Sequence, residues 1–164
     1  MDPIREARRQ WLAHGWTDAA DGMAMMTSLV RVHQLVLERI DFVLRPYGLT
    51  FARFELLRLL AFTHSGSMTM TRLGSLLQVH PTSVTSAVDR LVAQGYAVRR
   101  RGMEDGRLVL AVITDDGRAI VEKATAGLNS DVFARPGVDT GQVAELSALL
   151  SALRSDAGDP VDTD

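Results

Sequence analysis

Cysteine is absent from this chain of 164 residues, and so is any long apolar run. Without thiols the protein can form no disulfide, use no cysteine nucleophile or thiol redox sensor, and ligate no zinc through sulfur. No segment approaches the roughly 18 apolar residues that a membrane-spanning helix needs. The first residues, 1–6, lack the apolar stretch of a secretory signal. We therefore expect a cytoplasmic protein with no membrane partner.

Sequence motifs of the common catalytic and metal sites are also missing. There is no G-x-G-x-x-G, no G-x-x-x-x-G-K-[ST], no H-E-x-x-H and no G-x-S-x-G. The four histidines, at positions 14, 33, 64 and 80, show no metal-site spacing. We therefore expect a protein that is not an enzyme and that uses neither a metal nor a cofactor.

The formal net charge of −2 alone would argue against a nucleic-acid partner, but the charge is unevenly distributed. Residues 68–113 hold six arginines against three acidic residues, a balance of +3. Residues 114–164 hold four basic residues against ten acidic ones, a balance of −6. Such an asymmetry indicates a locally basic surface in the middle of the chain.

Apolar residues recur at helical spacing over most of the sequence. We expect a polar extension over 1–22 with a short helix, then helices over 23–44, 51–62, 71–78, 81–95, 114–133 and from about 140 to 154. Two strands, 96–101 and 107–113, enclose a turn, and residues 155–164 form an acidic, disordered tail. Thr50, Thr71 and Thr114 are expected N-caps, and Gly95 is an expected C-terminal cap.

The two central helices each have an apolar face. The first is expected to bury Leu73, Leu76 and Leu77, and the second Val84, Val88, Leu91 and Val92. The opposite face of the second helix carries small or hydrogen-bonding side chains, namely Thr82, Ser83, Thr85, Ser86, Asp89 and Arg90.

A helix, a tight connection, a second helix and an arginine-rich hairpin follow one another in the order of a winged helix-turn-helix. In that arrangement the second helix lies in the major groove of DNA, and its hydroxyl groups can contact bases or phosphates. Arginines of the hairpin, here Arg99, Arg100, Arg101 and Arg107, can neutralise phosphates or enter the minor groove. A winged helix that binds only other proteins remains an alternative, as does a small enzyme.

Five runs of residues resemble the multiple antibiotic resistance regulator (MarR) family of bacterial transcription factors. They are residues 73–77, 81–91, 94–100, 105–107 (Asp-Gly-Arg) and 113–118, and the resemblance extends over about residues 23–154. It implies a winged helix-turn-helix over 50–114, flanked by dimerisation helices at 23–46 and 115–154. It further implies a homodimeric repressor whose partner is double-stranded DNA with a pseudo-palindromic operator. The family more often has serine where this chain has His80, so either His80 or Thr82 could cap the second helix.

These considerations give a set of expected DNA contacts. They are Arg72, Thr82, Ser83, Thr85, Ser86 and Arg90 on the helices, and Arg101, Asp105 and Arg107 on the wing. The resemblance implies that Arg107 reaches the minor groove while Asp105 orients its guanidinium.

A small-molecule effector is a further implication of the resemblance, and the candidate pocket residues are Trp11, Trp16, His33 and Glu55. The urate-responsive branch of the family has an extra N-terminal helix with a pocket tryptophan. It also has an aspartate and, seven residues later, an arginine in its second helix. Glu55 and Phe62 stand at those two positions here, so the arginine is lost and a urate site is not expected. His33 lies on the apolar stripe of the first long helix, where a core histidine is the simpler interpretation.

Overall fold

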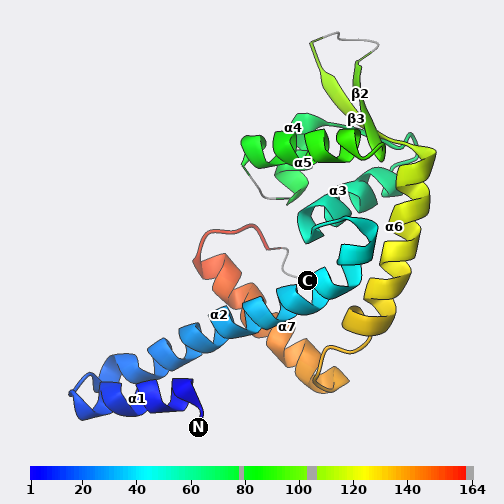
Figure 1. Cartoon of the computed structure of the whole chain (residues 1–164). Helices are drawn as coiled ribbons and strands as arrows, with labels where there is room; N and C mark the ends of the chain where they lie inside the picture. Colours follow the sequence, from blue (N-terminus) through cyan, green and yellow to red (C-terminus); the bar gives the residue numbers. More distant parts are fainter. Residues whose placement is uncertain (78–79, 103–106, 162–164) are drawn as a thin grey trace.

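The chain folds mainly into helices, with one small antiparallel sheet (Figure 1). This computed structural model describes residues 1–77, 80–102 and 107–161. In chain order the elements are α1 (Pro3–Ala13), α2 (Thr17–Leu44), the 3-10 turn η1 (Arg45–Tyr47), α3 (Phe51–Phe62), β1 (Ser67–Thr69), α4 (Met70–Leu77), α5 (Pro81–Ala93), β2 (Ala97–Arg101), β3 (Val109–Ile113), α6 (Asp115–Leu128), the π-helical turn η2 (Asn129–Phe133) and α7 (Thr140–Asp156). The expected fold class, mainly α with a small β-hairpin wing, is confirmed.

The first long helix is longer than the sequence indicated, because α2 begins at Thr17 rather than at residue 23. The short helix α1 turns back along the first part of α2 (Figure 1). An ion pair of 2.6 Å between Arg8 Nε and Asp21 Oδ1 joins the two helices, and Ala20 is fully buried. No helix within the described ranges is both long and apolar enough to cross a membrane.

The sheet has three strands in the order β1-β3-β2, of which the sequence predicted two. The missed strand, β1, has only three residues, and Met68 pairs with Ala111 of β3. Three residues are too few to display an alternating pattern, so the segment around Gly66 resembled a simple turn.

The core lies where α3, α5 and α6 meet the sheet, and Leu57, Leu60, Leu91 and Ala111 are fully buried there. Thr50 caps α3 and Thr114 caps α6, as predicted from the sequence. Gly95 has a φ of 78° just beyond α5, which confirms its role at the end of that helix.

Three other predictions about the central helices are wrong. Thr69, not Thr71, caps α4, since its hydroxyl accepts the Arg72 amide at 3.2 Å. Leu76 is 51% exposed because it faces a surface groove rather than the core. Val92 is 39% exposed because, eight residues after Val84, it is rotated about 80° away from the buried stripe.

The ends of the chain also differ from expectation. His33 is exposed and is not a core residue, because none of the described residues covers this part of the α2 stripe. The last helix, α7, begins where predicted, but it extends through Asp156 into the segment expected to be a disordered tail. Arg154 in the last turn of α7 pairs with Asp159 just beyond the helix, with 2.5 Å between Nε and Oδ2. No residue of α7 is buried.

Candidate nucleic-acid interface

The N-terminus of α5 is capped by His80. Its Nδ1 accepts the backbone N–H of Thr82 at 3.2 Å, and Pro81 occupies the first helical position, where no amide hydrogen is needed. The sequence left the cap open between His80 and Thr82, and the structure assigns it to His80.

The exposed face of α5 gathers four of the residues predicted to contact DNA. Thr82, Ser83, Ser86 and Arg90 all line one open hollow of about 410 Å³. Val84, Val88 and Leu91 on the opposite side are buried, so packing fixes which face of α5 is presented to solvent. Thr85 is also exposed but lies outside the lining of the hollow.

Arg99 of β2 makes contacts within the protein. Its Nη1 lies 2.7 Å from Oδ1 of Asp89, and its Nη2 donates to the Thr85 carbonyl at 3.4 Å. Arg99 thus joins β2 to α5, and the carboxylate of Asp89 offsets its positive charge. The sequence instead suggested that Arg99 contacts a DNA phosphate. Arg100 and Arg101 are exposed on the same strand.

The base of the wing is described, and its tip is not. The Gly102 amide donates to the Leu108 carbonyl at 2.9 Å, which closes the hairpin below the tip. Arg101 and Arg107 are both exposed beside this closure. Asp105 lies outside the described residues, so its orientation of Arg107 stays a prediction. Arg72 is exposed on α4 and does not line the hollow beside α5.

Sequence reasoning missed one charged member of this surface, Arg53 at the start of α3. Arg53 and Thr50 line the same hollow as the α5 residues. Arg53 Nε donates to Thr50 Oγ1 at 3.2 Å, and its Nη1 donates to Gln94 Oε1 at 3.1 Å. An arginine in the first turn of a helix is unusual, because the positive end of the helix dipole repels it. That position was the one available signal in the sequence.

Comparison with known proteins identifies the family. The MarR family model matches residues 47–108. The structure of Sco5413, a MarR family transcriptional regulator from Streptomyces coelicolor, superposes with a TM-score of 0.76 at 45% identity, over 85% of this chain and 99% of that one. The chain belongs to the MarR family.

Two further relatives bear on the activity of this MarR-family protein. The transcriptional repressor Rv2887 of Mycobacterium tuberculosis is 28% identical over 84% of this chain and 98% of its own length. A MarR mutant from E. coli, solved in complex with operator DNA, is 25% identical with a TM-score of 0.73, over 82% of this chain and 96% of that one. The chain is a DNA-binding transcriptional regulator, and the alternative of a winged helix that binds only proteins is not favoured.

A second cavity of this MarR-family chain lies away from the α5 face and contains Glu55. The cavity has a volume of about 280 Å³, and its lining is largely aromatic and aliphatic. The lining residues are Phe51, Phe54, Glu55, Arg58, Leu59, Phe62, Leu76, Leu77 and Phe133. We name it the α3 groove. Burial raises the pKa of the Glu55 carboxyl.

Arg58 is the basic group of the α3 groove. Its Nη2 pairs with Glu122 Oε1 at 2.8 Å, its Nη1 donates to Thr125 Oγ1 at 3.2 Å, and its guanidinium lies 4.5 Å from the centre of the Phe62 ring. This pairing lowers the pKa of Glu122. The Arg58 Nε is buried and has no hydrogen-bond partner among the described residues.

The four residues proposed from sequence as one effector pocket are not brought together within one chain. The rings of Trp11 and Trp16 meet edge to face with centroids 5.3 Å apart, and His14 stacks on Trp16. This cluster lies where α1 meets α2, at the opposite end of α2 from α3 and Glu55 (Figure 1). His33 is exposed between them on α2.

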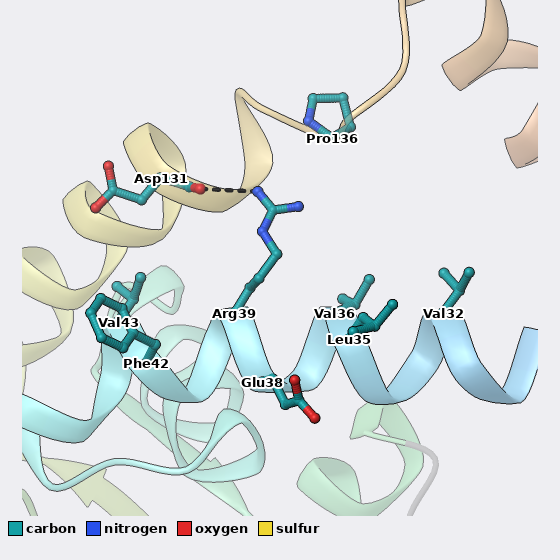
Figure 2. A pocket seen from close by; sticks show the side chains of 9 residues that line it. All are labelled: Val32, Leu35, Val36, Glu38, Arg39, Phe42, Val43, Asp131 and Pro136. Carbon is teal, nitrogen blue, oxygen red and sulfur yellow. Dashed lines mark hydrogen bonds between the residues drawn. The ribbon is translucent and has the colours of Figure 1, made fainter. Parts of the chain in front are cut away.

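An apolar hollow of about 780 Å³ lies along α2. Figure 2 shows Val32, Val36 and Arg39 on one side of the helix, facing the segment that links α6 to α7. Arg39 Nη2 donates to the carbonyls of Asp131 at 3.1 Å and Arg135 at 2.8 Å. Arg39 thus joins α2 to η2 and to the start of the segment that leads to α7.

Proposed function

We propose that this MarR-family regulator is a cytoplasmic, homodimeric repressor that binds a pseudo-palindromic operator and releases it when a small effector binds. The observation that carries the DNA-binding part is the gathering of Thr82, Ser83, Ser86 and Arg90 around one hollow on the exposed face of α5. These hydroxyl and guanidinium groups are suited to base edges and phosphates in a major groove.

The wing supplies the second part of the DNA contact. Arg101 and Arg107 reach the flanking minor groove and phosphates, and Asp105 orients the Arg107 guanidinium. Thr85 and Arg72 contact the DNA backbone at the edge of the interface. The exposure of the four described residues supports these roles.

The homodimer is supported by the amount of apolar side chain left uncovered on the helices outside the winged domain. Exposed apolar residues follow α2 and α7, namely Met26, Leu29, Val30, Val32, Leu35, Val36, Phe42, Val143, Leu146, Leu149 and Leu153. Single exposed apolar residues are ordinary, but a continuous set of this kind indicates an interface. A second copy related by a two-fold axis covers both helices and sets two α5 helices about 34 Å apart, one turn of DNA.

The α3 groove is the proposed effector site. It combines the Arg58 guanidinium with several aromatic rings, which suits a small anionic or phenolic molecule. Glu55 belongs to this groove, whereas Trp11, Trp16 and His33 can join it only from the partner copy. Because the groove is lined by α3, α4 and η2, an occupant touches both the winged domain and the helices of the proposed dimer.

One series of measurements tests this proposal. We expect a randomised-DNA selection to yield a palindrome, and sedimentation to give a dimer in solution. Leu149→Glu, which places a charge on the exposed face of α7, is expected to give folded monomers with weak operator binding. Failure of the wild-type protein to bind any selected or random duplex contradicts the DNA-binding part, and a dimer that persists in Leu149→Glu contradicts the assignment of α7.

The effector part has its own test. Binding of small aromatic acids such as benzoate is expected to lower operator affinity, and Phe62→Ala, whose side chain is 74% exposed, is expected to reduce that response without unfolding the protein. An identical response in Phe62→Ala contradicts the α3 groove as the site.

A further inference from the structure

We propose that Arg53 is a DNA-contact residue outside the helix-turn-helix and the wing, and that the hollow it shares with α5 binds a backbone phosphate of the bound duplex. This inference rests on the proposed DNA binding and adds a contact to it from α3. The sequence pattern predicted no DNA contact from the helix over 51–62.

Arg53 stands at a position that is unfavourable for a cation. It is the third residue of α3, after the cap Thr50, and the helix dipole there disfavours a cation. None of the ion pairs among the described residues includes Arg53. A cation that is kept in this place without an internal anion is available to an external one.

The Arg53 guanidinium is also held in one orientation. Two of its N–H groups are used, by Thr50 Oγ1 at 3.2 Å and by Gln94 Oε1 at 3.1 Å. Gln94 in turn donates from Nε2 to the Gly48 carbonyl at 2.8 Å. Gly48 has a φ of 65°, and a Cβ there would lie 3.0 Å from Gln94 Nε2. The turn before α3 thus leaves room for the amide that orients Arg53.

The composition of the hollow fits a phosphodiester. Arg53 and Arg90 contribute two guanidinium groups, and Thr50, Thr82, Ser83 and Ser86 contribute hydroxyl groups. No acidic side chain is among the described residues that line it. Guanidinium N–H groups of fixed direction match phosphate oxygens in geometry and charge. Since α5 lies in the major groove in the proposed complex, the anion nearest to this hollow is the DNA backbone.

A free inorganic anion would share this chemistry, and the two sources can be separated. A duplex phosphate bound here contributes to counterion release. Each such contact adds about 0.9 to the magnitude of the slope of log K for DNA binding against log salt concentration. A free-anion site contributes nothing to that slope. Titration calorimetry with inorganic phosphate reports the second source directly.

The main test uses the full-length protein and the variant Arg53→Gln. We expect the magnitude of the salt slope of operator binding to fall by about 2 for the dimer, which is about one unit for each protomer. The salt slope for binding to random duplex is expected to fall by the same amount. The affinity at moderate salt is expected to drop about tenfold or more. Arg5→Gln, on the remote helix α1, is the control of equal charge change and is expected to leave both quantities unchanged.

Gln94→Leu keeps the charge and removes the orienting amide. We expect weaker binding with an unchanged slope, a combination that a purely structural role of Arg53 would not give. Scanning the operator with single neutral methylphosphonates locates the contact. At one position in each half-site, the substitution is expected to weaken wild-type binding but not that of Arg53→Gln.

The proposal is overturned if Arg53→Gln and Arg5→Gln bind operator with the same affinity and the same salt slope. It is also overturned if inorganic phosphate binds in an Arg53-dependent way while the slope for DNA does not change. Absence of any DNA binding by the wild-type protein is a different result, because it removes the proposed function itself.

Discussion

Arg99 of β2 and Asp89 of α5 form an ion pair, with 2.7 Å between Nη1 and Oδ1. The same guanidinium donates a hydrogen bond to the Thr85 carbonyl. The wing is therefore joined both to a side chain and to the backbone of α5, the helix proposed to enter the major groove. Two elements that must contact DNA together are thereby held at a fixed mutual position. The pair also offsets the positive charge of Arg99 within the protein.

The energetic size of this pair can be measured in a double-mutant cycle of Asp89→Ala and Arg99→Ala. Both side chains are at least one-third exposed, and solvent screens such pairs, so we expect a coupling energy of about 0.2–1 kcal/mol in urea unfolding. A coupling well above that range would show that the pair is more strongly desolvated than its exposure indicates.

The wing contact is tested by Arg107→Ala. Removing one proposed phosphate or minor-groove contact from each protomer is expected to weaken binding to all duplexes and to lower the salt slope by about 0.9 per protomer. Fluorescence anisotropy titrations at several salt concentrations measure both quantities, with Arg5→Ala on α1 as the control. Unchanged affinity and slope would remove Arg107 from the interface.

Ser86 is expected to influence sequence preference rather than general affinity. It lies midway along the exposed face of α5 and lines the hollow with Thr82 and Arg90. Replacing it with alanine or asparagine changes the hydrogen-bonding groups offered to base edges, so a randomised-DNA selection should return different preferred bases at one position of each half-site. Identical selected sequences from wild type and both variants would exclude a base contact by this residue.

The helix-turn-helix could be predicted from the sequence because its pattern is local. Val84, Val88 and Leu91 recur at helical spacing, and their burial fixes the exposed face that carries Thr82, Ser83 and Ser86. Local patterns do not show which distant segments meet. Arg53 lies 37 positions before Arg90, and only the packing of α3 against α5 places both around one hollow.

The same limit explains the errors in the residues that were expected to be buried. His33 has apolar neighbours at helical spacing, but the sequence could not show that the described part of the chain leaves them uncovered. Leu76 has the spacing of a core residue and lies instead in the α3 groove, whose other walls come from α3 and η2. In both cases the missing information was a tertiary partner, not a local preference.

Gly117 is expected to tolerate no side chain. A Cβ at this position would lie 2.1 Å from the Tyr96 carbonyl oxygen, a backbone atom that cannot move aside cheaply. We expect Gly117→Ala to lower the free energy of unfolding by about 1–3 kcal/mol or more.

Gly22 provides the matched control, because a Cβ there meets nothing within 4 Å. It lies inside α2, where alanine is the better helix former, so Gly22→Ala is expected to stabilise the protein by a few tenths to about 1 kcal/mol. Equal effects of the two substitutions would contradict the close contact of α6 with Tyr96.

Glu55 gives a pH dependence whose sign follows from its burial. Burial raises the pKa of this carboxyl above the ordinary glutamate value of 4.5, so the folded state binds the proton more tightly than the unfolded state. Its contribution to stability is therefore fully present below pH 4.5 and is lost as the pH rises through the higher pKa of the folded state.

Glu55→Gln carries no charge at any pH and does not suffer this loss. We expect Glu55→Gln to be more stable than wild type near pH 7 and to approach the wild-type stability as the pH falls towards 4.5, as measured by urea unfolding at each pH. A Glu55→Gln curve parallel to wild type throughout would mean that the Glu55 carboxyl is hydrated in the folded protein.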